Sequence, residues 1–195
     1  MRKVSILAAC VLALGIIAAP TLAGEDCSCK EIKKAGYGYC KDCSTGTLFG
    51  VKLSSAKLYD ALAGHEVDMS KVKCSGCKSA AKTNGTCCGV SMANGKGYHA
   101  KASYSLALGK EVEMDKMKCK GCKEAASNSG FCEGCGAGVI AHRMFKPRSQ
   151  YDAAKSGLAL ITKAASSKCE DCAVAMVKDG SCKACKVAFK DGKKV

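Results

Sequence analysis

Apolar side chains recur at helical spacing in three short segments of the chain. Leu58, Ala61 and Leu62 fall on one face of a predicted helix. Ser54 or Ser55 is expected to cap the N-terminus of this helix. Helices predicted from such patterns cover residues 54–63, 101–108 and 150–163. Their apolar faces are expected to pack against other parts of the chain.

Other segments alternate apolar and polar positions, which is typical of extended chain. Residues 66–69 read Glu-Val-Asp-Met and residues 111–114 read Glu-Val-Glu-Met, and each predicts a short strand. The methionines are candidate soft ligands, but packing in the interior is the preferred interpretation. Further extended or turn segments are predicted over residues 44–53, 89–97 and 136–141. Together these elements indicate a small α+β fold.

The pattern repeats along the chain with a period of about 45 residues. Corresponding cysteines follow one another after 45, 45 and 50 residues, at Cys29, Cys74, Cys119 and Cys169. When residues 59–81 are laid over 104–126, thirteen of twenty-three positions are identical, which indicates duplication and a tandem array. We expect small cysteine-rich repeats joined by short helices in an elongated array. The predicted units cover residues 24–53, 54–97, 98–141 and 142–195.

The N-terminal segment has a different character. A basic start, an apolar run over residues 4–19 and small residues before a polar segment predict a secretory signal peptide over residues 1–23. An uncleaved anchor is the alternative. Cys10 resembles a lipoprotein-box cysteine, but the apolar run continues after it. We therefore expect an exported protein, periplasmic or extracellular, and no other segment approaches the length of a membrane span.

Composition supplies the candidate chemistry, because the 195-residue chain contains seventeen cysteines. All except Cys10 fall into four groups of four, although the first group has a shortened pair and the second has adjacent cysteines. Two Cys-x-x-Cys pairs separated by nine residues can bring four thiolates to one tetrahedral metal centre. The candidate ligands are Cys27, Cys29, Cys40, Cys43, Cys74, Cys77, Cys87, Cys88, Cys119, Cys122, Cys132, Cys135, Cys169, Cys172, Cys182 and Cys185.

The residues around each pair fit this chemistry. Helix-forming stretches follow the first pair of a group, so that this pair is expected at a helix N-terminus, where the backbone dipole favours thiolates. Glycines that stand two residues before the next cysteine are expected to turn the chain back. These glycines are Gly85, Gly130 and Gly180.

Two of the turns resemble those of known zinc-binding domains. Residues 132–136 read Cys-Glu-Gly-Cys-Gly and resemble a zinc knuckle, and Cys119 with Cys122 resembles the pair at the helix start of treble-clef domains. The resemblance covers only the metal-binding turns. It implies bound zinc, by default over another thiophilic ion, with a structural or interaction role and no enzymatic activity.

The pairing of cysteines within centres stays open at this point. Pairing within each group of four leaves no cysteine over and is preferred. A knuckle-to-helix order would instead join Cys40 and Cys43 with Cys74 and Cys77, and so on along the chain. That order leaves a pair without a partner at each end.

Two other chemistries suit paired cysteines. A disulfide-stabilised secreted scaffold is the main alternative, because an exported chain meets an oxidising compartment. Thiol–disulfide exchange is disfavoured, since a redox catalyst needs one low-pKa pair rather than eight similar ones. No pair is followed by histidine, which excludes c-type haem attachment. Because no Ser/His/Asp arrangement, phosphate loop or carboxylate pair recurs, we expect a protein that is not an enzyme.

The net charge of +14 falls to +12 when Arg2 and Lys3 leave with the signal peptide. A basic chain suits nucleic acid or an anionic surface, but this one has no tryptophan and no basic stretch interleaved with aromatics. Lysines flank the cysteines, where cations lower thiolate pKa and offset the charge of a metal–thiolate centre. Metal ions are therefore the expected partners, a protein or anionic surface is a further candidate, and nucleic acid is disfavoured.

The composition also argues against a large apolar core. Aromatic residues make up 5% of the chain, and each repeat is too small to bury enough apolar surface by itself. Metals or disulfides are therefore expected to stabilise the fold. The basic segment 142–148 has no counterpart in the other repeats and is expected to be a solvated insertion.

Overall fold

The computed structural model describes Cys29, Ile32 and residues 37–195. Short helices and small antiparallel sheets alternate along these residues, so the expected small α+β class is confirmed. The predicted signal peptide, Cys10 and Cys27 lie outside the described residues. Within the described part of the chain, no helix has both the length and the apolar character needed to cross a membrane.

The described strands form four small sheets, each built around a β-hairpin. Their orders are β1-β2-β3, β4-β7-β6-β5, β8-β11-β10-β9 and β12-β13-β14. The first two sheets contain β1 (Gly38–Cys40), β2 (Thr45–Leu48), β3 (Val51–Leu53), β4 (His65–Glu66), β5 (Thr86–Cys87), β6 (Val90–Ala93) and β7 (Lys96–Tyr98). The other two contain β8 (Lys110–Glu111), β9 (Phe131–Cys132), β10 (Ala137–Ile140), β11 (Arg143–Phe145), β12 (Ser181–Cys182), β13 (Val187–Lys190) and β14 (Lys193–Lys194).

Three helices begin directly after a cysteine, as the sequence predicts: α3 (Ser75–Thr83), α5 (Lys120–Ser127) and α7 (Glu170–Lys178). A residue with positive φ follows each helix, at Asn84, Ser129 and Asp179. The next residue is the expected glycine, whose N–H donates back to a helix carbonyl; Gly130 N lies 2.6 Å from Ala125 O. The chain therefore turns back where predicted, but the left-handed residue precedes the glycine.

The remaining helices connect one cysteine group to the next and are α2 (Ala56–Leu62), α4 (Lys101–Ala107) and α6 (Arg148–Ala165). Ser55 caps α2, because its hydroxyl accepts a hydrogen bond from Leu58 N at 3.2 Å. The predicted face of α2 is buried, with Leu62 fully inaccessible. Helix α6 runs to 18 residues and extends beyond its predicted bounds at both ends.

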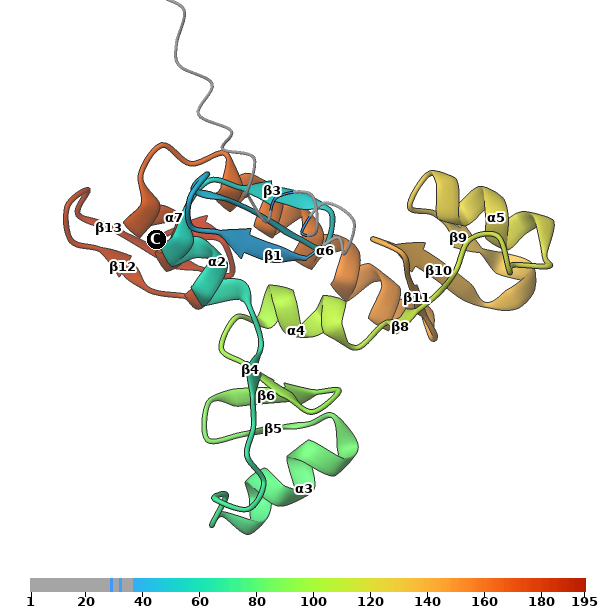
Figure 1. Ribbon diagram of the computed structural model, residues 1–195, viewed down its shortest axis with the longest axis horizontal. Helices are drawn as coiled ribbons and strands as arrows, with labels where there is room; N and C mark the ends of the chain where they lie inside the picture. The colour runs from blue at the N-terminus through green and yellow to red at the C-terminus, as the bar shows by residue number, and fades with distance from the viewer. Residues whose placement is uncertain (1–28, 30–31, 33–36) are drawn as a thin grey trace, which may run out of the picture.

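Helices α2, α4, α6 and α7 pack together at the centre of the molecule, and we call them the helical hub (Figure 1). Helices α4 and α6 approach closely, since a Cβ added at Gly157 would lie 2.7 Å from Ala102 O. The lobes that carry α3 and α5 project from the hub in different directions (Figure 1). The connecting helices thus meet in one place instead of separating the cysteine groups, and the elongated array is not confirmed.

One apolar core joins the hub to three of the sheets. It includes Leu53 of β3, Phe145 of β11 and Phe189 of β13, each at most 5% exposed. A large conventional core was not expected from the composition. It forms because several repeats, each too small alone, contribute side chains to a shared interior.

Two further expectations from the sequence are wrong. Met69 was assigned to the interior, but 38% of it is exposed. The basic segment 142–148 was interpreted as a solvated insertion, whereas Arg143–Phe145 forms strand β11 and Phe145 is 1% exposed. The Arg143 guanidinium donates to Gly109 O at 2.9 Å and forms an ion pair with Glu111, so its charge is held within the sheet.

Candidate metal centres

The sulfur atoms of the predicted ligands gather in four places, and all sulfur atoms of one group lie within 4.8 Å of one another. Each group comes from one local segment, so the preferred pairing within groups of four is the one that the fold produces. The groups are the Cys74 centre (Cys74, Cys77, Cys87, Cys88), the Cys119 centre (Cys119, Cys122, Cys132, Cys135), the Cys169 centre (Cys169, Cys172, Cys182, Cys185) and the Cys29 centre (Cys29, Cys40, Cys43). Cys27, the expected fourth member of the last group, lies outside the described residues.

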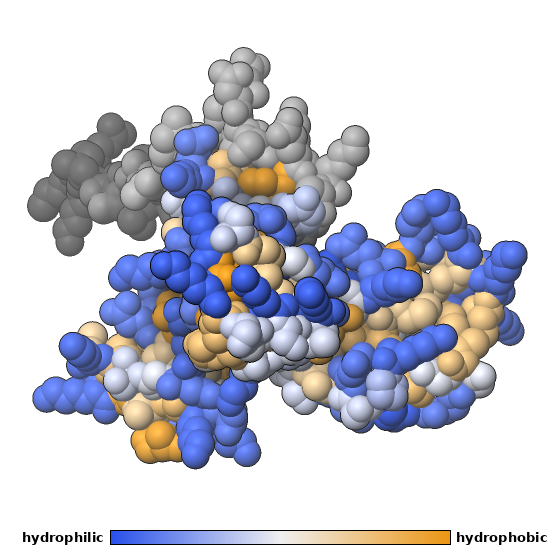
Figure 2. Space-filling view, turned by 90° about the horizontal axis from the view of Figure 1, so that it is seen from below, coloured by the Kyte–Doolittle hydropathy of each residue, from blue (hydrophilic) through white to orange (hydrophobic). Residues whose placement is uncertain are grey.

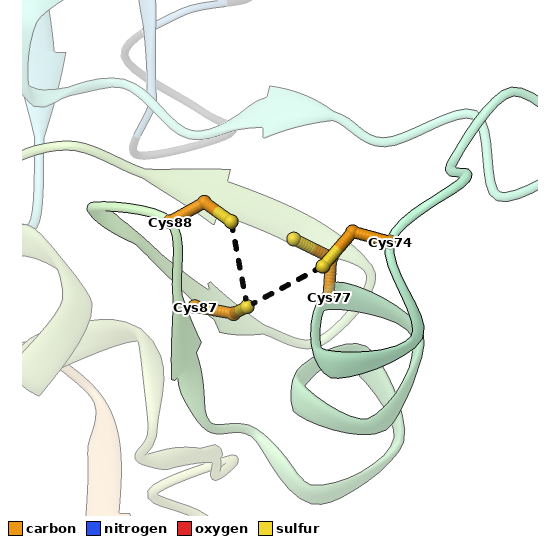
Figure 3. Close-up of side chains that lie close together, drawn as sticks. All are labelled: Cys74, Cys77, Cys87 and Cys88. Atoms are coloured by element: carbon orange, nitrogen blue, oxygen red, sulfur yellow. Dashed lines mark hydrogen bonds between the residues drawn. The ribbon is translucent and has the colours of Figure 1, made fainter.

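Two sulfur–sulfur distances in each of three centres are close to those of a tetrahedral metal site. In a regular tetrahedron with metal–sulfur bonds of about 2.3 Å, neighbouring sulfur atoms are about 3.8 Å apart. The distances are 3.9 and 3.6 Å in the Cys74 centre, 3.9 and 3.5 Å in the Cys119 centre, and 3.8 and 3.8 Å in the Cys169 centre. A disulfide would require about 2.05 Å. Figure 3 shows the four sulfur atoms of the Cys74 centre facing a common point.

The first cysteine of each helical pair is the N-cap of its helix, at Cys74, Cys119 and Cys169. The pKa of each thiol is lowered from 9.0 to about 7, and the largest cause is the backbone N–H group of the cysteine three residues later. Neighbouring thiols contribute next. The flanking lysines, which the sequence suggested as the cause, are not among the causes, so the helix start itself favours the thiolate.

The second cysteine of each helical pair behaves in the opposite way. The pKa of Cys77 is raised to about 12 by hydrogen bonding with Cys87, and that of Cys122 to about 12 by burial. The pKa of Cys172 is raised as well, through Cys182. In each of these three helical pairs the first cysteine is therefore favoured as the thiolate, while the second is favoured as the protonated thiol. A cation is what would allow all four to ionise together.

Glycine makes room for the sulfur atoms in two of the helical turns. A Cβ added at Gly76 would lie 2.9 Å from Cys87 Sγ, and one added at Gly121 would lie 2.9 Å from Cys132 Sγ. Both distances are shorter than real Cβ contacts. Asp171 occupies the corresponding position of the Cys169 centre. The close approach of a ligand sulfur therefore requires glycine in two of the three helical turns.

The second pair of each centre lies at a hairpin, with its first cysteine at the end of a strand and its second in the loop, and one of these loops is shorter than the others. Strand pairing leaves four residues in the loop between Cys40 and Thr45, between Cys132 and Ala137, and between Cys182 and Val187. Only Cys88 and Gly89 lie between Cys87 and Val90. Both have positive φ, 53° and 76°, as a two-residue hairpin turn requires.

Two ion pairs connect cysteine turns to the helical hub, and the sequence analysis did not identify them. Glu133, between Cys132 and Cys135, pairs with Arg148 at the start of α6. Asp171, in the turn before Cys172, lies 3.3 Å from Lys57 of α2. In both cases the sequence shows an acidic residue between two paired cysteines. Lys57, the partner of Asp171, however lies 114 positions away along the chain.

The Cys29 centre has a shorter sulfur–sulfur distance than the other three centres. Cys29 Sγ lies 3.1 Å from Cys43 Sγ, and Cys40 is 1% exposed. Its hairpin supplies Cys40 from the end of β1 and Cys43 from the four-residue loop, as in the Cys119 and Cys169 centres. Three of the four expected ligands are therefore together.

Comparison with known protein families, with curated proteins and with solved structures finds no match to this chain. The metal-binding geometry is therefore the basis on which a function is proposed.

Proposed function

We propose that this protein is an exported, non-enzymatic protein that holds four thiophilic metal ions, zinc by default, one in each cysteine group. The observation that carries the proposal is the set of sulfur–sulfur distances of 3.5 to 3.9 Å in three centres. Soft thiolate ligands in a tetrahedral set of four are typical of structural zinc sites.

Such ions would stabilise parts of the chain that bury little. Helix α3 buries only Ala80, and α5 buries only Cys122 and Ala125. Metal binding contributes directly to folding where ligands come together only in the folded state. In this proposal the centres act as tandem zinc-knuckle-like turns, either to hold metal or to present a rigid surface to a partner.

The charge of the chain suits this role. A zinc ion bound by four thiolates has a net charge of about −2, so four centres would bring the +12 of the mature chain to about +4. The basic residues then serve to offset the metal centres as well as to keep the protein soluble.

The alternative function is that of a disulfide-stabilised secreted scaffold. It is disfavoured because the sulfur–sulfur distances of 3.5 to 3.9 Å in three centres are far above the length of a disulfide bond. The local groups are nevertheless close enough that oxidation could link them, so the oxidation state of the exported protein decides between the two functions.

The test is the mass of the exported protein under native and then denaturing conditions. We expect four bound ions and, after denaturation in the presence of an alkylating agent, sixteen alkylated cysteines. The same preparation gives the mature N-terminus, which we expect at Gly24. Eight disulfides without bound metal would contradict the proposal and support the scaffold.

A further inference from the structure

Among the cysteines that the structure describes, those of the Cys74 centre are the most exposed. Cys74 and Cys88 are exposed and neither of their two partners is buried. Each of the other centres has at least one buried sulfur-bearing residue, at Cys40, Cys122, Cys132 and Cys182. An attacking ligand can therefore reach the Cys74 centre without any displacement of the core.

The unit that carries this centre, residues 65–98, is also separate from the main apolar core. Every other cysteine unit supplies buried side chains to that core, such as Leu53, Phe145 and Phe189. Residues 65–98 instead share a small cluster of Ala93, Tyr98 and Ala107 with α4. Opening of this unit would leave the interior of the rest of the molecule intact.

The turns of the Cys74 centre also lack the acidic residues that connect the Cys119 and Cys169 centres to the hub. Ser75 and Gly76 lie within its helical pair, and no residue separates Cys87 from Cys88. Arg148, by contrast, pairs with Glu133 and lies 4.4 Å over the Phe131 ring, which holds the Cys119 centre against α6. Exposed ion pairs are individually weak, but these mark direct contact with the hub.

The charged side chains around the Cys74 centre are mainly basic. Two acids at the start of the same unit, Glu66 and Asp68, form ion pairs with Lys96 and Lys71. No aspartate or glutamate occurs between residues 69 and 110. Lys73, Lys78 and Lys82 are exposed beside the centre and along α3. Figure 2 views the molecule from the side of α3 and shows hydrophilic side chains over much of this face. An approaching anion would be attracted here.

We propose, resting on the proposed function, that the four centres divide into two kinds: the Cys74 centre passes its ion to an anionic thiol-bearing acceptor, and the other three retain theirs. The transfer is a ligand exchange without redox chemistry. Each acceptor thiol loses its proton as its sulfur binds the ion, each departing cysteine sulfur takes up one proton, and the ion keeps its +2 charge.

The order of release tests this inference on the zinc-loaded protein. The probe is 2,3-dimercaptopropanesulfonate, an anionic dithiol, with N-ethylmaleimide to alkylate the freed cysteines and native mass spectrometry to count the ions. The first ion to leave is expected to expose Cys74, Cys77, Cys87 and Cys88, about tenfold or more faster than any other group. Release first from another centre, or from all at equal rates, would overturn the inference but not the proposed function. A protein without bound zinc would overturn both.

Loop length supplies a matched variant. Insertion of Glu-Gly between Cys87 and Cys88 copies residues 133–134 and restores a four-residue hairpin loop. We expect release from the Cys74 centre to become several-fold slower in this variant. Unchanged release would show that the short loop does not make the centre exchangeable.

Single ligand substitutions test whether the Cys74 centre is independent of the hub. Cys88→Ser is expected to remove one ion and leave the main thermal transition unchanged. Cys135→Ser, the control at the Cys119 centre, is expected to remove one ion and also lower that transition. An equal loss of thermal stability in both variants would contradict the separation of the two kinds of centre.

The charge of the acceptor is tested with dithiothreitol, a neutral dithiol. At low salt, zinc release is expected to be faster with the anionic dithiol than with the neutral one, and this difference in rate should be larger at the Cys74 centre than at the others. The double substitution Lys73→Gln and Lys78→Gln should reduce this preference. A preference that is the same at every centre and in the variant would overturn the anionic character of the acceptor.

Discussion

Gly121 gives the sharpest test of the site geometry, because the absence of its side chain makes room for a ligand sulfur. It lies in the first turn of α5, between Cys119 and Cys122. A Cβ at this position would be 2.9 Å from Cys132 Sγ, whereas ordinary contacts begin at 3.4 Å. The substitution Gly121→Ala therefore requires the sulfur atom to move by about half an ångström.

Two effects of this substitution oppose each other. Alanine in place of glycine stabilises a helix by about 0.5–1 kcal/mol. A displacement of half an ångström exceeds the tolerance of about 0.2 Å for a metal–ligand bond. Disturbed support of ligands lowers metal affinity about 10- to 100-fold, which corresponds to about 1.4–2.8 kcal/mol. The steric effect is the larger, so we expect weaker zinc binding at the Cys119 centre.

The assay is competition for zinc with a chromophoric chelator, together with the absorption of Co²⁺ bound in place of zinc. Gly134→Ala is the control, because Gly134 lies in the hairpin loop of the same centre and a Cβ there meets nothing within 4 Å. If both variants bind as tightly as the parent protein, the close approach of Cys132 is not a constraint. The first turn of α5 would then accommodate a side chain as readily as the corresponding turn of α7, which contains Asp171.

Three further predictions concern the core, a helix cap and the thiols. Phe145→Ala should destabilise the protein by about 3–5 kcal/mol in urea unfolding, since the ring is buried in the shared core, whereas Met69→Ala should change little. Ser55→Ala should cost about 1 kcal/mol in the same assay, because α2 loses its N-cap hydrogen bond. After metal removal, iodoacetamide at pH 7.5 should alkylate Cys169 before Cys172, because the pKa of Cys169 is lowered to about 7 and that of Cys172 is raised, and α7 also packs in the shared core through Met176 and Val177. The lowered pKa of Cys169 contributes stability that rises with pH above about 7, and equal alkylation rates without urea would contradict both expectations.

The cysteine groups could be predicted because their geometry is local. A nine-residue spacer returns the chain to its start through one short helix and a turn, so spacing alone places the sulfur atoms together. The helix starts at Cys74 and Cys119 and the N-cap at Ser55 could be predicted for the same reason. In each case the determining residues lie within a few positions of one another.

The helical hub could not be predicted, because its contacts join segments far apart in the chain. Helix α2 packs on α7, more than one hundred residues away. Much of the hub interior consists of small side chains such as Ala102 of α4 and Ala154 and Ala164 of α6. These form no clear apolar pattern in a chain rich in alanine. The strand at Arg143 was missed for a different reason. Its charges dominate the local sequence, although its alternation places Phe145 inside.

The cysteine centres and the apolar core stabilise different parts of the same molecule, and the balance between them differs from unit to unit. In the Cys169 unit, α7 supplies Cys172 and also buries Met176 and Val177 in the core. Loss of metal there would disturb the hub directly. In the unit of residues 65–98 the same local architecture contributes no side chain to that core. A centre in this position can gain or lose an ion at little cost to the rest of the protein, so four similar ligand sets need not have the same role.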